Sequence, residues 1–216
     1  MPRATDAGTE TIILGKTEDR LKALGLLTLR LAMGGLLAGH GAQKLFGSFG
    51  GFGLQGTSGF LESMGHKPGW LWASAAGGSE FGGGVLTALG FLSPIGPIST
   101  VGAMGMATLT VHRGKPIWVT EGGAELPVVY MGIATALSLL GPGRYSLDRA
   151  LGIRLPRWVA WLAAGATGAG IAYGLAGRSA PAQSAADTQL EATDELEQEV
   201  AVTAGRPSTE TVAAAG

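Results

Sequence analysis

Five long apolar runs constrain the fold of this chain more than any other feature of its sequence. They are 17 to 23 residues long and cover positions 23–41, 70–92, 95–111, 124–140 and 158–176. A helix rises about 1.5 Å per residue, so each run is long enough to cross the roughly 30 Å hydrocarbon core of a bilayer. The alternative is a set of buried helices in a soluble protein, but such helices normally carry a polar stripe, which these runs lack. The runs therefore predict an all-α integral membrane protein.

The composition supports this prediction and excludes several kinds of site. Only 14% of the 216 residues are charged, whereas about 25% is usual in soluble domains. The chain has no Cys, which excludes disulfides, thiolate nucleophiles, Cys-ligated iron–sulfur clusters and covalently attached haem. We expect the lipid membrane, and no nucleic acid, as a partner.

The charge and turn signals divide the chain into four parts. Residues 1–20 form a polar segment, and residues 21–150 hold the first four runs, which predict a four-helix membrane bundle. Residues 151–177 hold an interfacial segment and an appended fifth transmembrane helix. Residues 178–216 carry 2 basic and 7 acidic side chains, which predicts an acidic disordered tail. The stretch LSPIGP at 92–97 predicts a tight hairpin between the second and third helices.

The distribution of Lys and Arg predicts the orientation. With five crossings, one side holds eight basic residues and the other holds four. The larger group is Arg3, Lys16, Arg20, Lys22, Arg144, Arg149, Arg154 and Arg157. Because cytoplasmic loops carry the excess of Lys and Arg, we predict a multi-pass protein with a cytoplasmic N-terminus.

A glycine-rich stretch, AGHGAQKLFGSFGGFGLQG at 38–56, contains the pattern G-x-G-x-x-G at Gly51, Gly53 and Gly56. A dinucleotide site needs a strand before this pattern and a helix after it. Here an apolar helix precedes the pattern, so we reject a nucleotide site. We expect the glycines to turn the chain at the interface, and Thr57 or Ser58 to cap a short helix ending near Met64.

Two charged residues lie near the middle of apolar runs. Arg30 is near the middle of the first run and Glu80 near the middle of the second. A charge at the bilayer centre costs at least about 2.5 to 3.5 kcal/mol on insertion scales, so we expect these two to pair. The flanking G-x-x-x-G patterns at 35–39 and 78–82 favour a close approach of the two helices. The pair would either fix the helix register or form the charged floor of a cavity.

A second polar group is expected at one end of the bundle, where the first and third helices leave the membrane and the fourth enters it. Its members are His40, Gln43, Lys44, His112 and Glu125. These side chains would bind a quinone head group, hold a metal, or simply lie among lipid head groups. No metal-ligand spacing supports the second interpretation, so we expect no metal. His66 lies in a loop, and we expect it at the surface.

Several stretches resemble the DoxX family of small bacterial membrane proteins. They are RLAMGGLLAGHGAQKLFGSFGG at 30–51, GGSEFGGGVLTALGFLSP at 77–94, MATLTVH at 106–112, EGGAELP at 121–127 and GPGRYSLD at 141–148. The resemblance implies a four-helix core in the bacterial cytoplasmic membrane. It also implies that Arg30, His40, Lys44, Glu80, His112 and Glu125 form its polar pattern.

The resemblance suggests two functions of different classes. Some members resemble DoxD-like subunits of a thiosulfate:quinone oxidoreductase, which suggests a redox-linked subunit that passes electrons from a sulfur or thiol donor to quinone. The other function is a non-catalytic membrane scaffold for an oxidoreductase partner. A small-molecule carrier is disfavoured because no broken helix pair or inverted repeat is evident. The chain has no cofactor motif of its own, so the sequence does not decide whether it is an enzyme.

Overall fold

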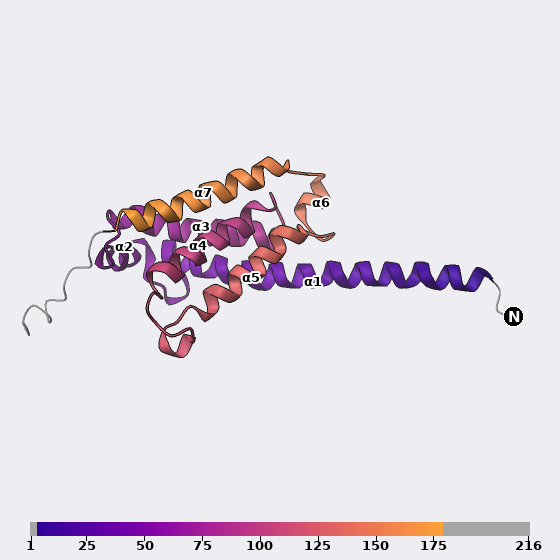
Figure 1. Ribbon diagram of the computed structural model, residues 1–216, viewed down its shortest axis with the longest axis horizontal. Coiled ribbons are helices and arrows are strands. Elements are labelled where there is room, and N and C mark those ends of the chain that lie inside the picture. The colour runs from indigo at the N-terminus through magenta and orange to yellow at the C-terminus, as the bar shows by residue number, and fades with distance from the viewer. Residues whose placement is uncertain (1–3, 179–216) are drawn as a thin grey trace, which may run out of the picture. The chain divides into compact units, whose positions relative to one another are not determined.

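The computed structural model describes residues 4–178, with side chains from Gly15 onward. These residues form helices and no strand, which confirms the all-α prediction for this part of the chain (Figure 1). The long elements are α1 (Ala4–Phe46), α3 (Gly69–Leu89), α4 (Ile95–Thr110), α5 (Glu125–Leu140) and α7 (Arg157–Ala176). The short ones are α2 (Gly53–Ser63), α6 (Leu147–Leu151) and the 3-10 turns η1 (Ser48–Gly50) and η2 (Val119–Glu121). Apart from Arg178, the predicted tail lies outside the described residues.

The first helix is longer than the sequence pattern predicted. α1 contains 43 residues, which corresponds to about 65 Å at 1.5 Å per residue. Its N-terminal part projects beyond the other helices (Figure 1). The polar segment predicted at 1–20 is therefore, from Ala4 onward, the beginning of this helix. An exposed pair of Glu18 and Lys22, 3.8 Å apart and one turn apart in sequence, supports the helix there.

The contacts among the long helices connect α1, α3, α4 and α5 with one another and α7 with α4. α1 packs against α3 and α5, and α4 packs against both α3 and α5. The buried centre of this group is formed by Met33, Ala134 and Leu137. α2 covers parts of α1 and α3, whereas α7 lies along α4.

Glycines set the register between α1 and α3, but they are not the ones that the sequence predicted. A Cβ atom on Gly34 would lie 2.6 Å from the carbonyl oxygen of Gly84, and one on Gly41 would lie 2.7 Å from that of Gly77. These contacts require glycine because the two backbones approach too closely for any side chain. The G-x-x-x-G residues Gly35, Gly39, Gly78 and Gly82 have no atom of another element within 4 Å of that position. The interface therefore uses a seven-residue spacing on both helices.

The turns agree in part with the expectations. Gly47, Gly50 and Gly53 adopt positive φ angles of 70°, 76° and 65° between α1 and α2, so the glycine-rich stretch does reverse the chain. The short helix follows as predicted, but it begins at Gly53, and the Thr57 hydroxyl donates to the Gly53 carbonyl oxygen instead of capping the helix.

The predicted hairpin at 92–97 joins α3 and α4. The buried Asp148 stabilises it, since its carboxylate oxygens each accept a 2.8 Å hydrogen bond, one from the backbone N–H of Leu92 and one from that of Ser93.

Two of the described helices are long and apolar enough to cross a bilayer, namely α1 over Gly15–Phe46 and α7. Only 28% of the apolar stretch of α1 and 6% of that of α7 is buried within the structure. A core helix of a soluble protein would be mostly buried, so the low burial of these two helices favours an apolar environment or a partner over a place in a soluble core. The arrangement of five membrane-spanning helices stays a prediction.

Candidate binding cavity

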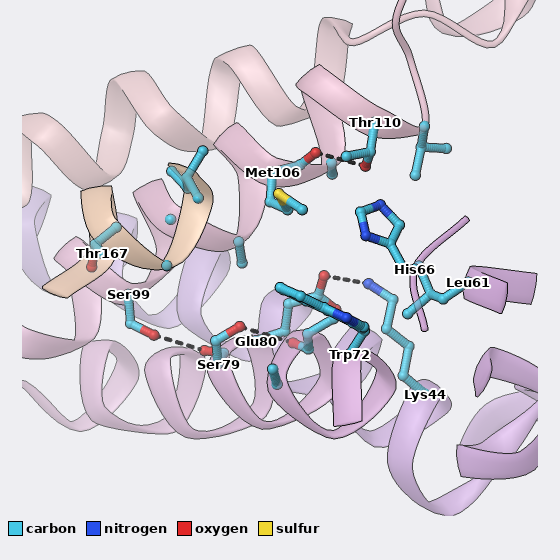
Figure 2. A pocket seen from close by; sticks show the side chains of 18 of the residues that line it. Lys44, Leu61, His66, Trp72, Ser79, Glu80, Ser99, Met106, Thr110 and Thr167 are labelled. Carbon is cyan, nitrogen blue, oxygen red and sulfur yellow. Dashed lines mark hydrogen bonds and ion pairs between the residues drawn. The ribbon is translucent and has the colours of Figure 1, made fainter. Parts of the chain in front are cut away.

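A cavity of about 440 Å³ lies among the end of α1, α2, α3, α4 and α7. Ligand-binding cavities usually measure about 300 to 1,000 Å³. Most of the lining is aliphatic or aromatic, with side chains such as Phe60, Ile98 and Met106. The charged and titratable side chains in the lining are Lys44, His66 and Glu80 (Figure 2). Such a mixture suits a ligand with an apolar body and one polar end.

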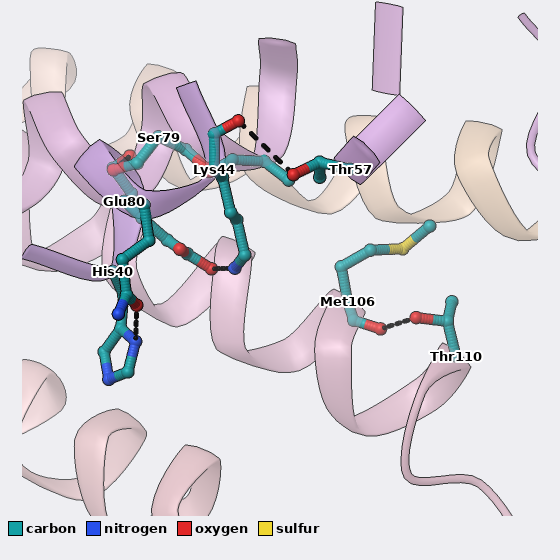
Figure 3. A network of polar contacts seen from close by, with 10 residues as sticks. His40, Lys44, Thr57, Ser79, Glu80, Met106 and Thr110 are labelled. Atoms are coloured by element: carbon teal, nitrogen blue, oxygen red, sulfur yellow. Dashed lines mark hydrogen bonds and ion pairs between the residues drawn. The ribbon is translucent and has the colours of Figure 1, made fainter. Parts of the chain in front are cut away.

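Lys44 and Glu80 form an ion pair in the cavity wall. The Lys44 ammonium donates to Glu80 Oε1. The Glu80 side chain is 3% exposed and that of Lys44 is 36% exposed. Lys44 is also held at its backbone, because its carbonyl oxygen accepts a 3.3 Å hydrogen bond from the Thr57 hydroxyl (Figure 3). Glu80 Oε2 is buried and has no hydrogen-bond partner among the described residues.

The structure corrects the predicted pair of Arg30 and Glu80. Arg30 is buried and donates to the carbonyl oxygens of Ala88 at 3.2 Å, Tyr145 at 2.8 Å and Pro142. The glycine contacts between α1 and α3 place Arg30 opposite Gly90, ten residues or about 15 Å along α3 from Glu80. The prediction placed the first helix in the wrong register because it assumed that each charge lay at the midpoint of its run.

His66, expected at the surface, is instead buried in the cavity wall. It is 2% exposed, and neither ring nitrogen has a hydrogen-bond partner among the described residues. Its ring lies 5.4 Å from that of Trp72 between centroids. Burial lowers the pKa of His66 below its ordinary value of 6.5, and the positive charge of Arg178 lowers it further. The imidazole is therefore neutral at pH 7, with one nitrogen able to donate a hydrogen bond and the other able to accept one.

Nothing local in the sequence identified His66. It lies in the segment MGHKPGWLW between α2 and α3, where glycine and proline indicate a loop and a loop normally lies at the surface. Its burial comes from α2 and α3, which fold over it, and from Trp72.

The other residues of the predicted cluster have separate partners. His40 is exposed, and its Nδ1 lies 3.1 Å from Gln43 Oε1. His112 Nδ1 donates to the Gly122 carbonyl oxygen at 2.6 Å, and Glu125 Oε2 accepts from the Val119 N–H at 3.0 Å. The last two contacts hold the connection between α4 and α5. Of the five predicted residues, only Lys44 lines the cavity. Among the side chains that the structure describes, from residue 15 to residue 178, no three His, Asp or Glu side chains gather as metal ligands would.

Most of the hydroxyl groups in the lining donate to nearby backbone oxygens. Ser79 donates to Ala76 at 2.9 Å, Ser99 to Ser79 at 3.2 Å and Thr110 to Met106 at 2.7 Å. The polar groups left to bind a ligand include the second oxygen of Glu80, the remaining ammonium protons of Lys44, both nitrogens of His66, the Trp72 indole N–H and the Thr167 hydroxyl.

Comparison with known proteins gave one match. The DoxX family model matches residues 25–113, a range that contains most of α1 and all of α2, α3 and α4. Searches of curated proteins and of solved structures found no match. The matched range includes Lys44, His66 and Glu80, whereas the α7 wall of the cavity lies outside it.

Proposed function

We propose, from the match of residues 25–113 to the DoxX family model, that this chain binds quinone in the cavity as a membrane subunit of a redox-linked complex. The proposal includes a multi-pass arrangement in the bacterial cytoplasmic membrane with the N-terminus inside. The observation that carries it is the set of buried polar atoms without partners, Glu80 Oε2 and both His66 nitrogens, in an otherwise apolar cavity.

The membrane part of the proposal is supported by apolar side chains that face outward. Leu36 on α1, Leu139 on α5 and Trp161 on α7 are 62%, 82% and 76% exposed. In water such a surface would be costly, because burying one side chain of this size contributes about 1.5 to 3 kcal/mol. In a bilayer the same surface needs no further cover.

Because the chain has no Cys, single-cysteine variants test the orientation directly. Ser63→Cys at the end of α2 and Ala150→Cys in α6 are both at exposed positions, on opposite sides of the proposed membrane. A membrane-impermeant maleimide should label the first variant in intact cells and the second only after permeabilisation. The reverse labelling pattern would place the N-terminus outside.

The polar atoms of the cavity fit a quinone head. Its two carbonyl oxygens accept hydrogen bonds, and Lys44 and neutral His66 can donate them. Glu80 has a free oxygen that can accept a hydrogen bond from a hydroxyl of the reduced quinol, since the oxidised quinone itself has no donor. Burial shields these contacts from water, which strengthens them.

The proposed reaction links two half-reactions. When bound, quinone would supply an acceptor for two electrons and two protons. Two thiosulfate ions joined through a new sulfur–sulfur bond, as tetrathionate, would supply the two electrons. The residues of this chain would hold the quinone head, exclude water and move protons at Glu80 Oε2. The sulfur donor is proposed from the family resemblance.

Membranes that contain the protein test the function. Thiosulfate should drive quinol formation, and Glu80→Gln should reduce the rate at least tenfold while the amount of folded protein stays unchanged. His40→Ala is the matched control, because His40 lies outside the cavity lining, and it should keep the rate. If His40→Ala abolishes turnover and Glu80→Gln does not, the site is the cluster predicted from the sequence instead of the cavity. Full turnover in both variants would exclude both the cavity and the predicted cluster as the site of quinone reduction.

A scaffold for an oxidoreductase partner is the second candidate. It is favoured by the exposed, charged stretch of α1 from Lys16 to Lys22, which projects beyond the other helices (Figure 1). A scaffold would keep quinol formation in membranes independent of Glu80 and would lose a co-purifying oxidoreductase when residues 1–20 are removed.

A further inference from the structure

The last helix supplies one wall of the cavity. Ala163, Ala166, Thr167, Gly170 and Ile171 line it, and their spacing of three and four residues places them on one face of α7. Four of these five side chains are small. The same helix carries large apolar residues elsewhere, with Leu162 and Tyr173 65% and 70% exposed. The small residues therefore lie where α7 faces the cavity.

α7 contacts its neighbours tightly on either side of Gly170. On one side, Thr167 Cγ2 lies 2.6 Å from the position that a Cβ on Gly102 would take. On the other side, a Cβ on Gly174 would lie 2.5 Å from Met106 Cε and 2.9 Å from the Trp72 ring. Between these contacts, a Cβ on Gly170 would meet nothing within 4 Å. α7 thus contacts α4 on both sides of Gly170 and α3 on one side, with Ile171 Cδ1 3.5 Å from the Cβ position of Gly105 between them, and the open space at Gly170 is part of the cavity.

The cavity is open along the seam between α3 and α7. Ala75 on α3 and Ala166 and Gly170 on α7 line the cavity and are at the same time exposed. The exposed part of α7 is apolar, so a molecule that enters along this seam arrives from an apolar environment.

The polar end of the cavity limits the head group of that molecule. Lys44 and Glu80 already neutralise each other, and His66 is neutral at pH 7. A charged head would have to leave water without a free counter-charge, which is unfavourable. An uncharged head that accepts and donates hydrogen bonds would satisfy Glu80 Oε2 and the His66 nitrogens.

We propose that α7 is the tail-binding wall of the cavity, so that the site takes an uncharged, hydrogen-bonding head with an apolar tail that lies against Gly170. This rests on the ligand site of the proposed function but not on its redox step. According to this proposal, α7, which lies outside the range matched by the DoxX model, selects ligands by their tails.

The test fills the gap from α7 alone. Gly170→Leu places a large side chain at the cavity lining from α7, whereas the charged pair of the wall comes from α1 and α3. Gly168→Leu is the matched control, because this position is exposed, lies outside the cavity lining and has nothing within 4 Å of its Cβ position. Both substitutions replace glycine by leucine in the same helix, so the gain in helix propensity is the same.

Binding is measured by quenching of Trp72 fluorescence in nanodiscs. Trp70, Trp118, Trp158 and Trp161 are at least 60% exposed, so they can be replaced by Phe to leave Trp72 alone in the cavity wall. The probes are a decyl-substituted benzoquinone, the same benzoquinone without its decyl chain, and a bromine-labelled decanol that has the tail but no redox chemistry.

Gly170→Leu should weaken binding of the two tailed probes at least tenfold and leave the tail-free quinone within twofold, and Gly168→Leu should change none of them. Equal effects of both variants, or none from Gly170→Leu, would overturn the proposal. Suppose that the brominated decanol binds, that Gly170→Leu weakens its binding at least tenfold, and that neither quinone binds. The tail-binding role of α7 is then supported, and quinone is the wrong ligand. If only the tail-free quinone binds, quinone is supported as the ligand, but the tail-binding role of α7 is wrong.

Discussion

The two ends of the described bundle bury charged groups in different ways. At one end, Arg30 and Asp148 are surrounded by backbone: Arg30 donates to three carbonyl oxygens, and Asp148 accepts from two N–H groups. At the other end, Glu80 has one partner for two oxygens, and His66 has none for either nitrogen. Leaving such a buried group unpaired costs about 1 to 3 kcal/mol. Arg30 Nε is also buried without a partner, but the other two guanidinium nitrogens and both Asp148 oxygens are satisfied, so the two ends differ in how fully their buried polar groups are paired.

The largest effect is expected at the structural end. Arg30→Met leaves three carbonyl oxygens without their donor, and we expect it to destabilise the fold by roughly 3 kcal/mol or more. Thermal unfolding in mild detergent measures the loss, with Arg30→Lys as the control that keeps the charge but not the planar fork of donors. Arg30→Met with unchanged stability would remove the contrast between the two ends.

Removal of the Lys44–Glu80 pair should affect binding more than stability. Glu80→Gln should weaken binding of the decyl-substituted benzoquinone at least tenfold and lower stability by only about 1 kcal/mol, since half-exposed Lys44 can still reach water. The double variant Lys44→Met with Glu80→Gln should recover stability without recovering binding. If binding also recovers, the charged pair is structural like Arg30.

His66 should show opposite effects on stability and on binding. His66→Leu removes two buried nitrogens that lack partners, so stability should stay equal or rise by about 1 kcal/mol. Binding of the same quinone should fall several-fold, as measured by Trp72 quenching. A loss of stability in His66→Leu with unchanged binding would mean that the ring serves packing against Trp72 alone.

The smallest effect concerns pH. Since the pKa of His66 is lowered in the folded protein, the unfolded chain binds its proton first as the pH falls. This contribution to stability is complete above the unfolded value of about 6.5 and decreases as the pH falls from there through the lowered folded value. The unfolding temperature should therefore fall below pH 6.5 more in the wild type than in His66→Leu. Parallel curves for the two proteins would exclude His66 as the group responsible.

The helices and the presence of buried charges could be predicted from the sequence. Apolar runs, Pro–Gly turns and the scarcity of charge identify α3, α4, α5 and α7 to within a few residues, because these signals are local. Arg30 and Glu80 stand out for the same reason, since an ionised group in an apolar run needs a partner wherever the run lies. The helical start of α1 was not predicted, because the prediction relied on apolar runs. The residues before the first run are polar, although they belong to the same helix.

Only the tertiary structure decided which groups meet. Successive residues of a helix are about 100° apart around its axis, so contact through Gly34 and Gly41 instead of Gly35 and Gly39 presents a different face of α1 to α3. That choice pairs Glu80 with Lys44 and directs Arg30 to backbone carbonyls about 15 Å away. The burial of His66 likewise depends on α2, α3 and Trp72 folding over a loop. Sequence fixes which side chains must find partners, but the partner follows from interhelical packing, which brings together residues that are distant along the chain.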